Sequence, residues 1–330
     1  MNEGPKVSVG MPVYNGEKKL AKALESIINQ TYTNIEIIIS DNCSTDLTSE
    51  ICRKYLGLDA RIKYTRFEEN RGTIANFNNV FNLSSGDFFM WASHDDFHEP
   101  TFISECIKSF TDKPEAALCA PNMRGITSPK ATQHWIGDLS TFKDKNSVIS
   151  RYFETLRHFP AVAIYGLYRS SMIRRTSLLP KGVGADLLFI QNLALYGSFI
   201  GIDQVLFTYH GREKWNTVDE DYAVFYGKDK KPWYYSPFLI VFYNQVKIVI
   251  NCSHTIRVKL GLLGILMYFQ IGQFFLKIVL KIIKFAVPQK MKMKLATKIY
   301  WRFIHSPNVK VEMSDEFEER IIRPIVGLRT

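Results

Sequence analysis

The first 120 residues of the chain alternate short β-rich runs with segments of helical periodicity, and this order constrains the fold more than any other feature. The expected strands are residues 7–11, 35–39, 62–67, 88–92 and 116–120, and the expected helices between them are 20–30, 47–55, 73–83 and 100–110. Alternation of this kind implies parallel strands joined by right-handed crossovers. The sequence therefore predicts an α/β domain with a mostly parallel sheet and flanking helices. Further strands are expected at 161–168 and 199–208, and a further helix at 186–196.

Composition limits the class of protein and its compartment. The chain has 330 residues, of which 46% are hydrophobic, enough for one large domain with an appendage. None of its five cysteines forms a C-x-x-C pair, which argues against a disulfide framework or a zinc site and fits a reducing compartment. The first residues lack the basic and apolar regions of a signal peptide. We therefore expect a cytoplasmic catalytic domain.

The basic residues are concentrated toward the C-terminus. Residues 230–311 contain fourteen Lys or Arg and no Asp or Glu, which leaves 28 basic against 32 acidic residues in the rest of the chain. A block of this kind indicates an anionic partner surface. We therefore divide the chain into a catalytic domain, 1–229, and a basic, aromatic and helical membrane-associating region, 230–330.

Within that region an uncharged segment precedes a stripe of lysines. Residues 260–276 form an uncharged run at the lower length limit for spanning a bilayer. Lys277, Lys281 and Lys284 then recur on one side of an apolar helix, a pattern typical of a helix in the membrane interface with its lysines at anionic headgroups. A helix packed on the domain and a true span are the alternatives. Nucleic acid is not an expected partner, because aliphatic residues rather than stacking groups separate the lysines.

Polar or aromatic side chains follow three of the predicted strands. Tyr14 follows the first strand and could stack on a flat base, and Asp41 follows the second and could accept the imide N–H of a pyrimidine. Asp95 and Asp96 follow the fourth, where paired carboxylates suit a divalent cation that carries a pyrophosphate. In a parallel sheet these strand ends share one edge, where ligands of open α/β sheets bind. Singly, each residue could instead be a core aromatic or a helix cap.

The order of these motifs resembles the family 2 glycosyltransferases of the GT-A fold. The matching pieces are residues 9–15 (VGMPVYN), 24–32 (LESIINQTY), 40–46 (SDNCSTD), Asn70-Arg71-Gly72, Asn78, residues 93–96 (SHDD) and Pro100. The resemblance covers residues 6–125 well and 160–215 loosely. It implies a GT-A fold and a metal-assisted, inverting transfer of a sugar from a nucleotide-sugar donor.

The resemblance also implies roles for individual positions. The residues implied for nucleotide-sugar binding are Pro12 and Tyr14 in the base pocket, Asp41 on the pyrimidine, Asp46 near it or as a helix cap, Arg71, Asn78, and Asp95 facing the donor ribose or sugar. Asp96 would be the ligand of Mg²⁺ or Mn²⁺. The acidic triplet of the family usually begins with Asp, whereas His94 stands here, but its metal-binding end is kept.

The acceptor side of the resemblance centres on Asp186. The family carries Glu-Asp ahead of a helix that ends in Gly, with the Asp as general base, and the match here is Ala185-Asp186 with Gly197 after the helix. A base is needed because the acceptor hydroxyl loses its proton as it attacks the anomeric carbon opposite the nucleotide. A plain helix cap is the alternative for Asp186. His210, after a strand-like run, is expected as a further metal ligand or a diphosphate contact.

The expected function is an inverting glycosyltransferase of cell-surface glycan synthesis at the cytoplasmic face of the cell membrane, with a UDP- or dTDP-sugar donor and a glycan or lipid-linked acceptor. Two other classes stay open. A nucleotidyltransferase usually needs a Gly-rich basic loop after the first strand, and residues 14–19 contain one glycine. A non-catalytic nucleotide-binding membrane scaffold is supported only by His94 and Ala185. The sugar, the linkage and the choice between UDP and dTDP are not encoded in recognisable motifs.

Overall fold

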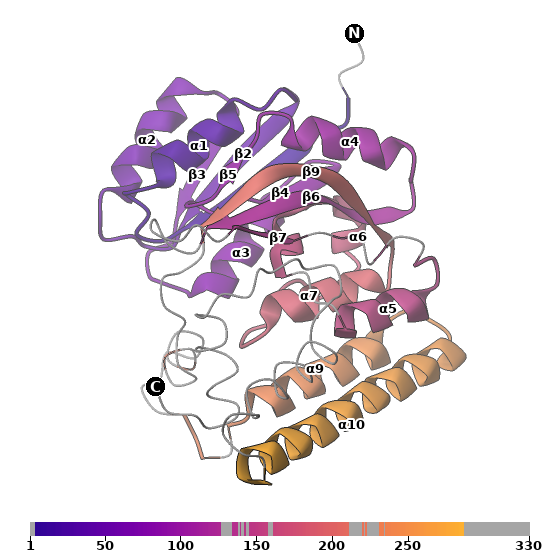
Figure 1. Cartoon of the computed structure of the whole chain (residues 1–330). Helices are drawn as coiled ribbons and strands as arrows, with labels where there is room; N and C mark the ends of the chain where they lie inside the picture. The colour runs from indigo at the N-terminus through magenta and orange to yellow at the C-terminus, as the bar shows by residue number, and fades with distance from the viewer. Residues whose placement is uncertain are drawn as a thin grey trace.

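The computed structural model places helices on both faces of one mixed sheet, with a pair of long helices outside one helical layer (Figure 1). The structure describes residues 4–126, 134–137, 139, 142, 145–157, 161–210, 220, 222, 231–233 and 235–286. The α/β expectation, with mostly parallel pairing in the N-terminal half and flanking helices, is confirmed.

Most elements form close to their predicted bounds. The strands are β1 (Val7–Val13), β2 (Ile35–Asp41), β3 (Ile62–Arg66), β4 (Phe88–Trp91), β5 (Phe97–His98), β6 (Ala116–Ile126), β7 (His134–Gly137), β8 (Leu167–Arg169) and β9 (Ser198–His210). The helices are α1 (Leu20–Ile28), α2 (Thr48–Leu58), α3 (Thr73–Asn82), α4 (Phe102–Thr111), α5 (Val148–Arg157), the 3-10 helix η2 (Ala161–Tyr165), α6 (Ser170–Ile173), α7 (Ala185–Ala194), α9 (Pro237–Asn251) and α10 (Ile256–Ala286).

The strand order places a switch point between β1 and β4. Strands β3, β2, β1 and β4 lie side by side in that order, and each neighbouring pair is parallel. The chain moves outward from β1 to β3, and β4 then pairs on the other side of β1. In open α/β sheets ligands bind at such a point, beyond the carboxyl ends of the strands. The fold therefore puts the predicted site residues where a ligand is expected.

Strand β4 is buried on both faces, which explains its continuous apolar sequence. Phe88 and Met90 join the core that also contains buried residues of α1 and α4, whereas Phe89 and Trp91 join the core shared with α3 and α7. The indole N–H of Trp91 donates to the carbonyl of Phe77 (2.9 Å). These contacts fix the end of β4 immediately before its two carboxylates.

The second half of the sheet corrects two predictions. Residues 161–168 were expected as one strand, but they form η2 and then the short β8, which is antiparallel to both β4 and β6. A short apolar run does not distinguish a strand from a buried helical turn, and Gly166 ends this turn. At Gly166 the backbone passes so close to β6 that a Cβ would lie 2.9 Å from the carbonyl oxygen of Cys119. Strands β6 and β9, parallel to each other, both run longer than expected.

Helices α9 and α10 form a hairpin against α5 and α7 (Figure 1). A small separate core seals this contact, and its buried members are Tyr152, Leu156, Leu195, Val249, Cys252, Leu262 and Leu266. The first part of region 230–330 therefore packs on the catalytic domain. In the part of the chain that the structure describes, no helix has the length and apolarity of a membrane span. The side chains of the lysine stripe at 277–284, and all residues after Ala286, lie outside the described part.

Candidate active site

The carboxyl ends of three strands meet in register at one edge of the sheet. Val13 of β1 lies beside Asp41 of β2, which lies beside Arg66 of β3. On the other side of β1, Gly10 pairs with Trp91, so β4 ends at the same edge. The segments that carry Tyr14, Asp41 and the Asp95–Asp96 pair therefore converge, as the sequence predicted.

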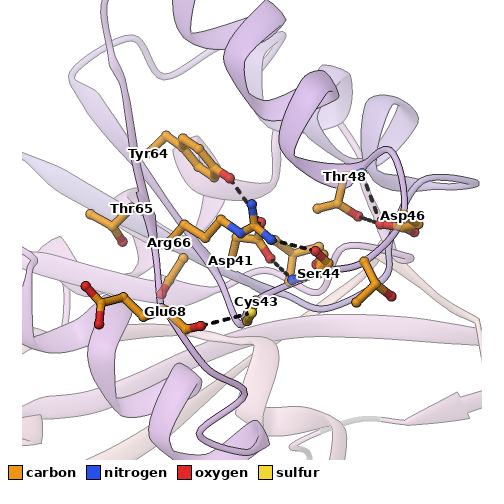
Figure 2. A network of polar contacts seen from close by, with 12 residues as sticks. Asp41, Cys43, Ser44, Asp46, Thr48, Tyr64, Thr65, Arg66 and Glu68 are labelled. Carbon is orange, nitrogen blue, oxygen red and sulfur yellow. Dashed lines mark hydrogen bonds and ion pairs between the residues drawn. The ribbon is translucent and has the colours of Figure 1, made fainter.

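Asp41 is the centre of a buried polar network (Figure 2). Its Oδ1 accepts a hydrogen bond from the backbone N–H of Ser44 (2.8 Å), and its Oδ2 accepts one from the hydroxyl of Tyr64 (3.0 Å). The Nε of Arg66 lies 3.4 Å from the same Oδ2. Burial and the bond to Asp41 raise the pKa of Tyr64, so this phenol stays protonated as a donor. The protein thus holds the carboxylate in place, and its contact with a pyrimidine stays a prediction.

The loop after β1 is tied to the loop after β2. The backbone N–H groups of Asn15, Gly16 and Glu17 donate to the side chains of Ser44 (2.9 Å), Thr48 (2.8 Å) and Asp46 (3.1 Å) respectively. Burial alone would raise the pKa of Asp46, but hydrogen bonds from Thr48 and from the backbone of Glu17 hold it below its usual value. Asp46 therefore acts as an ionised link between the two loops, just ahead of α2.

Two predicted base-pocket residues differ in exposure. Pro12 is buried within β1, where it pairs with Ser40. The Tyr14 side chain, at the tip of the tied loop, is 43% exposed. A partly exposed ring at the sheet edge is available for stacking, whereas the buried Pro12 has no surface of its own to offer a base.

Arg71 and Asn78 have defined but different surroundings. Asn42 accepts the backbone N–H of Arg71 (2.9 Å) and orders that loop, and the exposed guanidinium lies 4.7 Å from the ring centre of Phe67. The side-chain amide of Asn78 makes two hydrogen bonds to the backbone of Leu179 (2.9 and 3.1 Å). Asn78 thereby joins α3 to the segment that leads into α7, while the Arg71 guanidinium is exposed and packs on the ring of Phe67.

Asp96 is almost completely buried, and only one of its two carboxylate oxygens has a hydrogen-bond partner among the described residues. Its Oδ1 accepts the backbone N–H of His210 (2.7 Å), and its Oδ2 has no hydrogen-bond partner among the described residues. Burial and the neighbouring charge of Asp95 raise the pKa of Asp96 to about 8. Asp95 itself is half-buried and accepts a short hydrogen bond from the hydroxyl of Ser93. A buried carboxylate oxygen without a donor is what a bound cation would satisfy.

The pairing of β5 with β9 brings His210 to Asp96. Phe97 pairs antiparallel with Thr208, so the end of β9 lies beside the residue that precedes β5. The His210 ring packs edge-on against Phe97, and its buried Nδ1 has no partner among the described residues. Asp96 Oδ2 and His210 Nδ1 are thus two buried atoms of types that can bind a metal, on adjacent segments and without hydrogen-bond partners in the described part of the chain. The described side chains include no group of three potential ligands, so a cation here would take its remaining ligands from substrate and water.

His94 takes the first place of the acidic triplet without offering a charge. Its ring packs against Gly16, where an added Cβ would lie 2.8 Å from the imidazole. Burial lowers its pKa, which favours the neutral ring. His94 therefore fills space between the β1 loop and the β4 end.

Asp186, the predicted general base, lies in the first turn of α7. It is half-buried, its Oδ1 accepts the backbone N–H of Leu187 (2.8 Å), and burial raises its pKa despite that bond. Burial is the main cause that raises the pKa of the Tyr165 phenol, and the charges of Asp96, Asp95 and Asp186 act in the same direction. Tyr165 is therefore within electrostatic reach of carboxylates from the β4 end and from α7.

Sequence reasoning missed three residues of this site. Tyr165 was assigned to a strand interior. Lys19, just before α1, lies close enough to Asp96 and His210 for its charge to act on both. The buried amide of Asn76 donates to the carbonyls of Val13 (3.2 Å) and Ser40 (2.9 Å) and so joins α3 to β1 and β2. A polar residue on the buried face of a predicted helix was the available signal for Asn76.

Comparisons with known proteins agree with the geometry. The profile described as "Glycosyl transferase family 2" matches residues 8–178. The glycosyltransferase GlyA of Streptococcus pneumoniae is 30% identical over 216 residues, which are 63% of this chain and 31% of GlyA. The putative glycosyltransferase EpsE of Bacillus subtilis is 40% identical over 101 residues, which are 30% of this chain and 36% of EpsE. The matched parts thus cover about a third of each relative's length.

Among solved structures, residues 1–349 of S. aureus TarS in complex with UDP align with a TM-score of 0.59 and 20% sequence identity. The alignment covers 88% of this chain and 78% of that one. At this identity the likeness concerns the fold, and it extends beyond the family profile into the helical hairpin region.

Proposed function

Because the chain belongs to glycosyl transferase family 2, we propose that it is an inverting transferase that moves a sugar from a UDP- or dTDP-sugar to a hydroxyl group of a glycan or lipid-linked acceptor. The observation that carries the proposal is the buried Asp96 Oδ2, which has no partner among the described residues and lies at the sheet edge where β1 and β2 also end. Structures of TarS with UDP and with UDP-GlcNAc support a uridine donor by analogy of fold.

The nucleotide half of the donor would bind over the tied loops. Tyr14 would stack on the base, Asp41 would meet the pyrimidine edge, and Asp46 would keep the two loops together. Arg71 is exposed near Asn42 and would reach the phosphates or ribose. Lys19 adds positive charge beside Asp96, where the diphosphate would lie. This pocket supplies binding and orientation rather than chemistry.

The diphosphate end fits a divalent cation. Asp96 Oδ2 and His210 Nδ1 would hold Mg²⁺ or Mn²⁺, and Asp95 would face the donor ribose or sugar. When bound, the cation would neutralise the charge that develops on the departing diphosphate. Carboxylate and water oxygens suit both Mg²⁺ and Mn²⁺, and an imidazole ligand such as His210 is better accepted by Mn²⁺ than by Mg²⁺.

Asp186 would act as the general base. The acceptor oxygen forms the new bond to the anomeric carbon, the bond from that carbon to the diphosphate oxygen breaks, and the hydroxyl proton passes to the Asp186 carboxylate. A raised pKa makes this carboxylate a better proton acceptor than an ordinary Asp. One carboxylate on the face opposite the leaving group gives inversion, because no covalent sugar–enzyme intermediate is needed.

We further propose a role in cell-surface glycan synthesis at the cytoplasmic face of the membrane. The support is the basic block at 230–311, which favours an anionic surface, and the absence of acidic residues within it. An acceptor linked to a membrane lipid would meet the enzyme there.

Calorimetric titration with UDP, dTDP and GDP, each with and without Mn²⁺, tests the proposal. Metal-dependent binding of UDP or dTDP, with GDP much weaker, is the expected result. Absence of all nucleotide binding would refute the transferase assignment, and binding without transfer to any acceptor would favour the non-catalytic scaffold. Incorporation of the nucleoside monophosphate into product would instead indicate a nucleotidyltransferase.

A further inference from the structure

Helix α9 is apolar on both of its sides. Phe242, Val246 and Val249 face the core shared with α5 and α10. On the opposite side Leu239, Tyr243 and Ile250 are exposed at helical spacing, and the Leu239 side chain is 58% exposed. A helix that is apolar all round is normally covered on both sides, and here the described protein covers one.

Helix α10, which packs beside α9, also has an exposed apolar side. Its outer side exposes large apolar residues at Ile256, Leu260, Met267, Tyr268 and Ile271. Leu260 is 61% exposed and Tyr268 is 72% exposed, whereas Leu262 and Leu266 on the inner side are fully buried. We call the exposed side chains of α9 and α10 the hairpin face. Large exposed apolar side chains gathered on neighbouring helices in this way mark an interaction site.

The charge of the hairpin face selects its partner. Lys247 of α9 and Arg257 of α10 are exposed at its border, and no Asp or Glu occurs from residue 230 to residue 311. A groove of about 240 Å³ also opens at the start of α9, lined by Tyr235, Ser236, Leu239, Ile240 and Tyr243. Exposed apolar and aromatic side chains on helices whose charged residues are all basic match the acyl layer and the headgroups of an anionic bilayer.

The hairpin is bonded directly to the helix that carries Asp186. The buried side chain of Gln245 in α9 donates to Gln191 in α7 (3.0 Å) and accepts from Gln270 in α10 (3.2 Å). At the start of α7, Gly184 has a positive φ of 76°, and a Cβ there would lie 3.1 Å from Val241 of α9. Whatever the hairpin face binds is therefore held in a fixed relation to Asp186.

We propose that the hairpin face docks onto an anionic lipid bilayer and thereby presents membrane-linked acceptors to the start of α7. The docking step rests on the surface alone, whereas the presentation of an acceptor rests on the proposed transferase function. This assignment differs from the lysine stripe at 277–284, since it involves α9 and the first half of α10.

The test is flotation of the full-length protein with vesicles of 30% anionic and 70% neutral phospholipid, compared with purely neutral vesicles. A triple variant, Tyr243→Glu with Leu260→Glu and Tyr268→Glu, is expected to lower the affinity for anionic vesicles at least tenfold, because three apolar groups leave the acyl layer. Lys247→Glu with Arg257→Glu is expected to reduce binding to anionic vesicles and leave the neutral ones unchanged. All five positions are exposed, so folding is expected to survive.

The matched control is Leu47→Glu with Leu56→Glu and Leu58→Glu, three exposed leucines at and just before α2. This control is expected to bind vesicles like the wild type. Full binding by the hairpin variant would overturn the proposal and assign membrane contact to the residues beyond α10. A wild-type dimer in sedimentation velocity that the hairpin variant abolishes, without any vesicle binding, would overturn it in favour of a second copy of the chain. UDP titration of each variant separates this result from the proposed chemistry, since nucleotide affinity is expected to be unchanged.

Discussion

Two buried carboxylates at opposite ends of the sheet differ in the number of their hydrogen-bond donors and in the direction of their pKa shifts. Glu36 lies near the amino end of β2 and Asp96 beyond the carboxyl end of β4, and they are 3% and 1% exposed. Glu36 accepts hydrogen bonds from Ser8, Ser85, Lys6 and Lys63, which outweigh its burial and hold its pKa below the usual value. Asp96 has one protein donor and a raised pKa.

The difference indicates a structural role for Glu36 and a proposed ligand-binding role for Asp96. A buried charge is tolerated when its lone pairs are satisfied, as at the amino end. At the carboxyl end, one oxygen of Asp96 and one nitrogen of His210 are buried and have no hydrogen-bond partner among the residues that the structure describes. Natural folds accept such a cost mainly at functional sites. The comparison therefore predicts that damage at one end changes activity and damage at the other changes stability.

Asp96→Asn is expected to have the largest effect on activity. Loss of the proposed metal ligand should raise the activation free energy of transfer by several kcal/mol, which lowers the rate on the order of 10⁴-fold. It should also remove the metal dependence of UDP binding. The unfolding midpoint in chelator should stay the same or rise, because a neutral amide replaces an unsatisfied buried acid. Steady-state rates, calorimetry and thermal unfolding measure the three quantities. A variant that loses stability but keeps metal-dependent binding would place Asp96 with Glu36 as a structural group.

Asp186→Asn comes next, with an expected loss of about 10³-fold in kcat and little change in UDP affinity, since a general base acts only in the chemical step. The carboxylate accepts a proton only when ionised, so the wild-type rate should rise with pH through the pKa of Asp186. Burial raises that pKa, and the rise should therefore occur above the usual range of an aspartate. The pH–rate profile of the variant should lack this limb. Normal rates in Asp186→Asn would move the base to another residue and leave Asp186 with only its hydrogen bond to Leu187 in the first turn of α7.

The N-terminal half of the fold was predictable because its signals are local and repeated. Helix α1 has its apolar residues at helical spacing, and β4 is a continuous apolar run that ends at Asp95 and Asp96. Each strand end then follows from parallel pairing alone. The region from η2 to β9 was less predictable, because the antiparallel insertion of β8 depends on contacts with β4 and β6 that lie far away in sequence.

The site was predictable residue by residue but not in its contacts. Asp41, Asp96 and Asp186 stand at strand or helix ends that the pattern identifies. No sequence pattern shows that Tyr64 donates to Asp41 and that Arg66 forms an ion pair with it. Nor does any pattern show that the backbone N–H of His210, rather than its ring, donates to Asp96. Tyr165 enters the site only because η2 replaces the expected strand. Such contacts arise from tertiary packing, and local propensity contains no information about them.

Glu36→Gln is the smallest of these changes and the sharpest test of the comparison. The amide would keep the size of the side chain but would face Lys6 and Lys63 without a charge. We expect this change to lower the free energy of unfolding by about 1–3 kcal/mol. The loss is smaller than for a fully buried ion pair, because both lysines are partly exposed. The folded pKa of Glu36 lies below its unfolded value, so its stabilising contribution is complete above the unfolded pKa and is lost as the pH falls through the folded pKa. Urea unfolding at pH 7 should therefore separate wild type from variant, and the gap should narrow under acid conditions. UDP affinity should be equal in wild type and variant, since Glu36 lies at the opposite end of the sheet from the proposed site. A loss of nucleotide binding by a stable Glu36→Gln protein would show that the two ends of the sheet are coupled. The division between structural and functional carboxylates would then not hold.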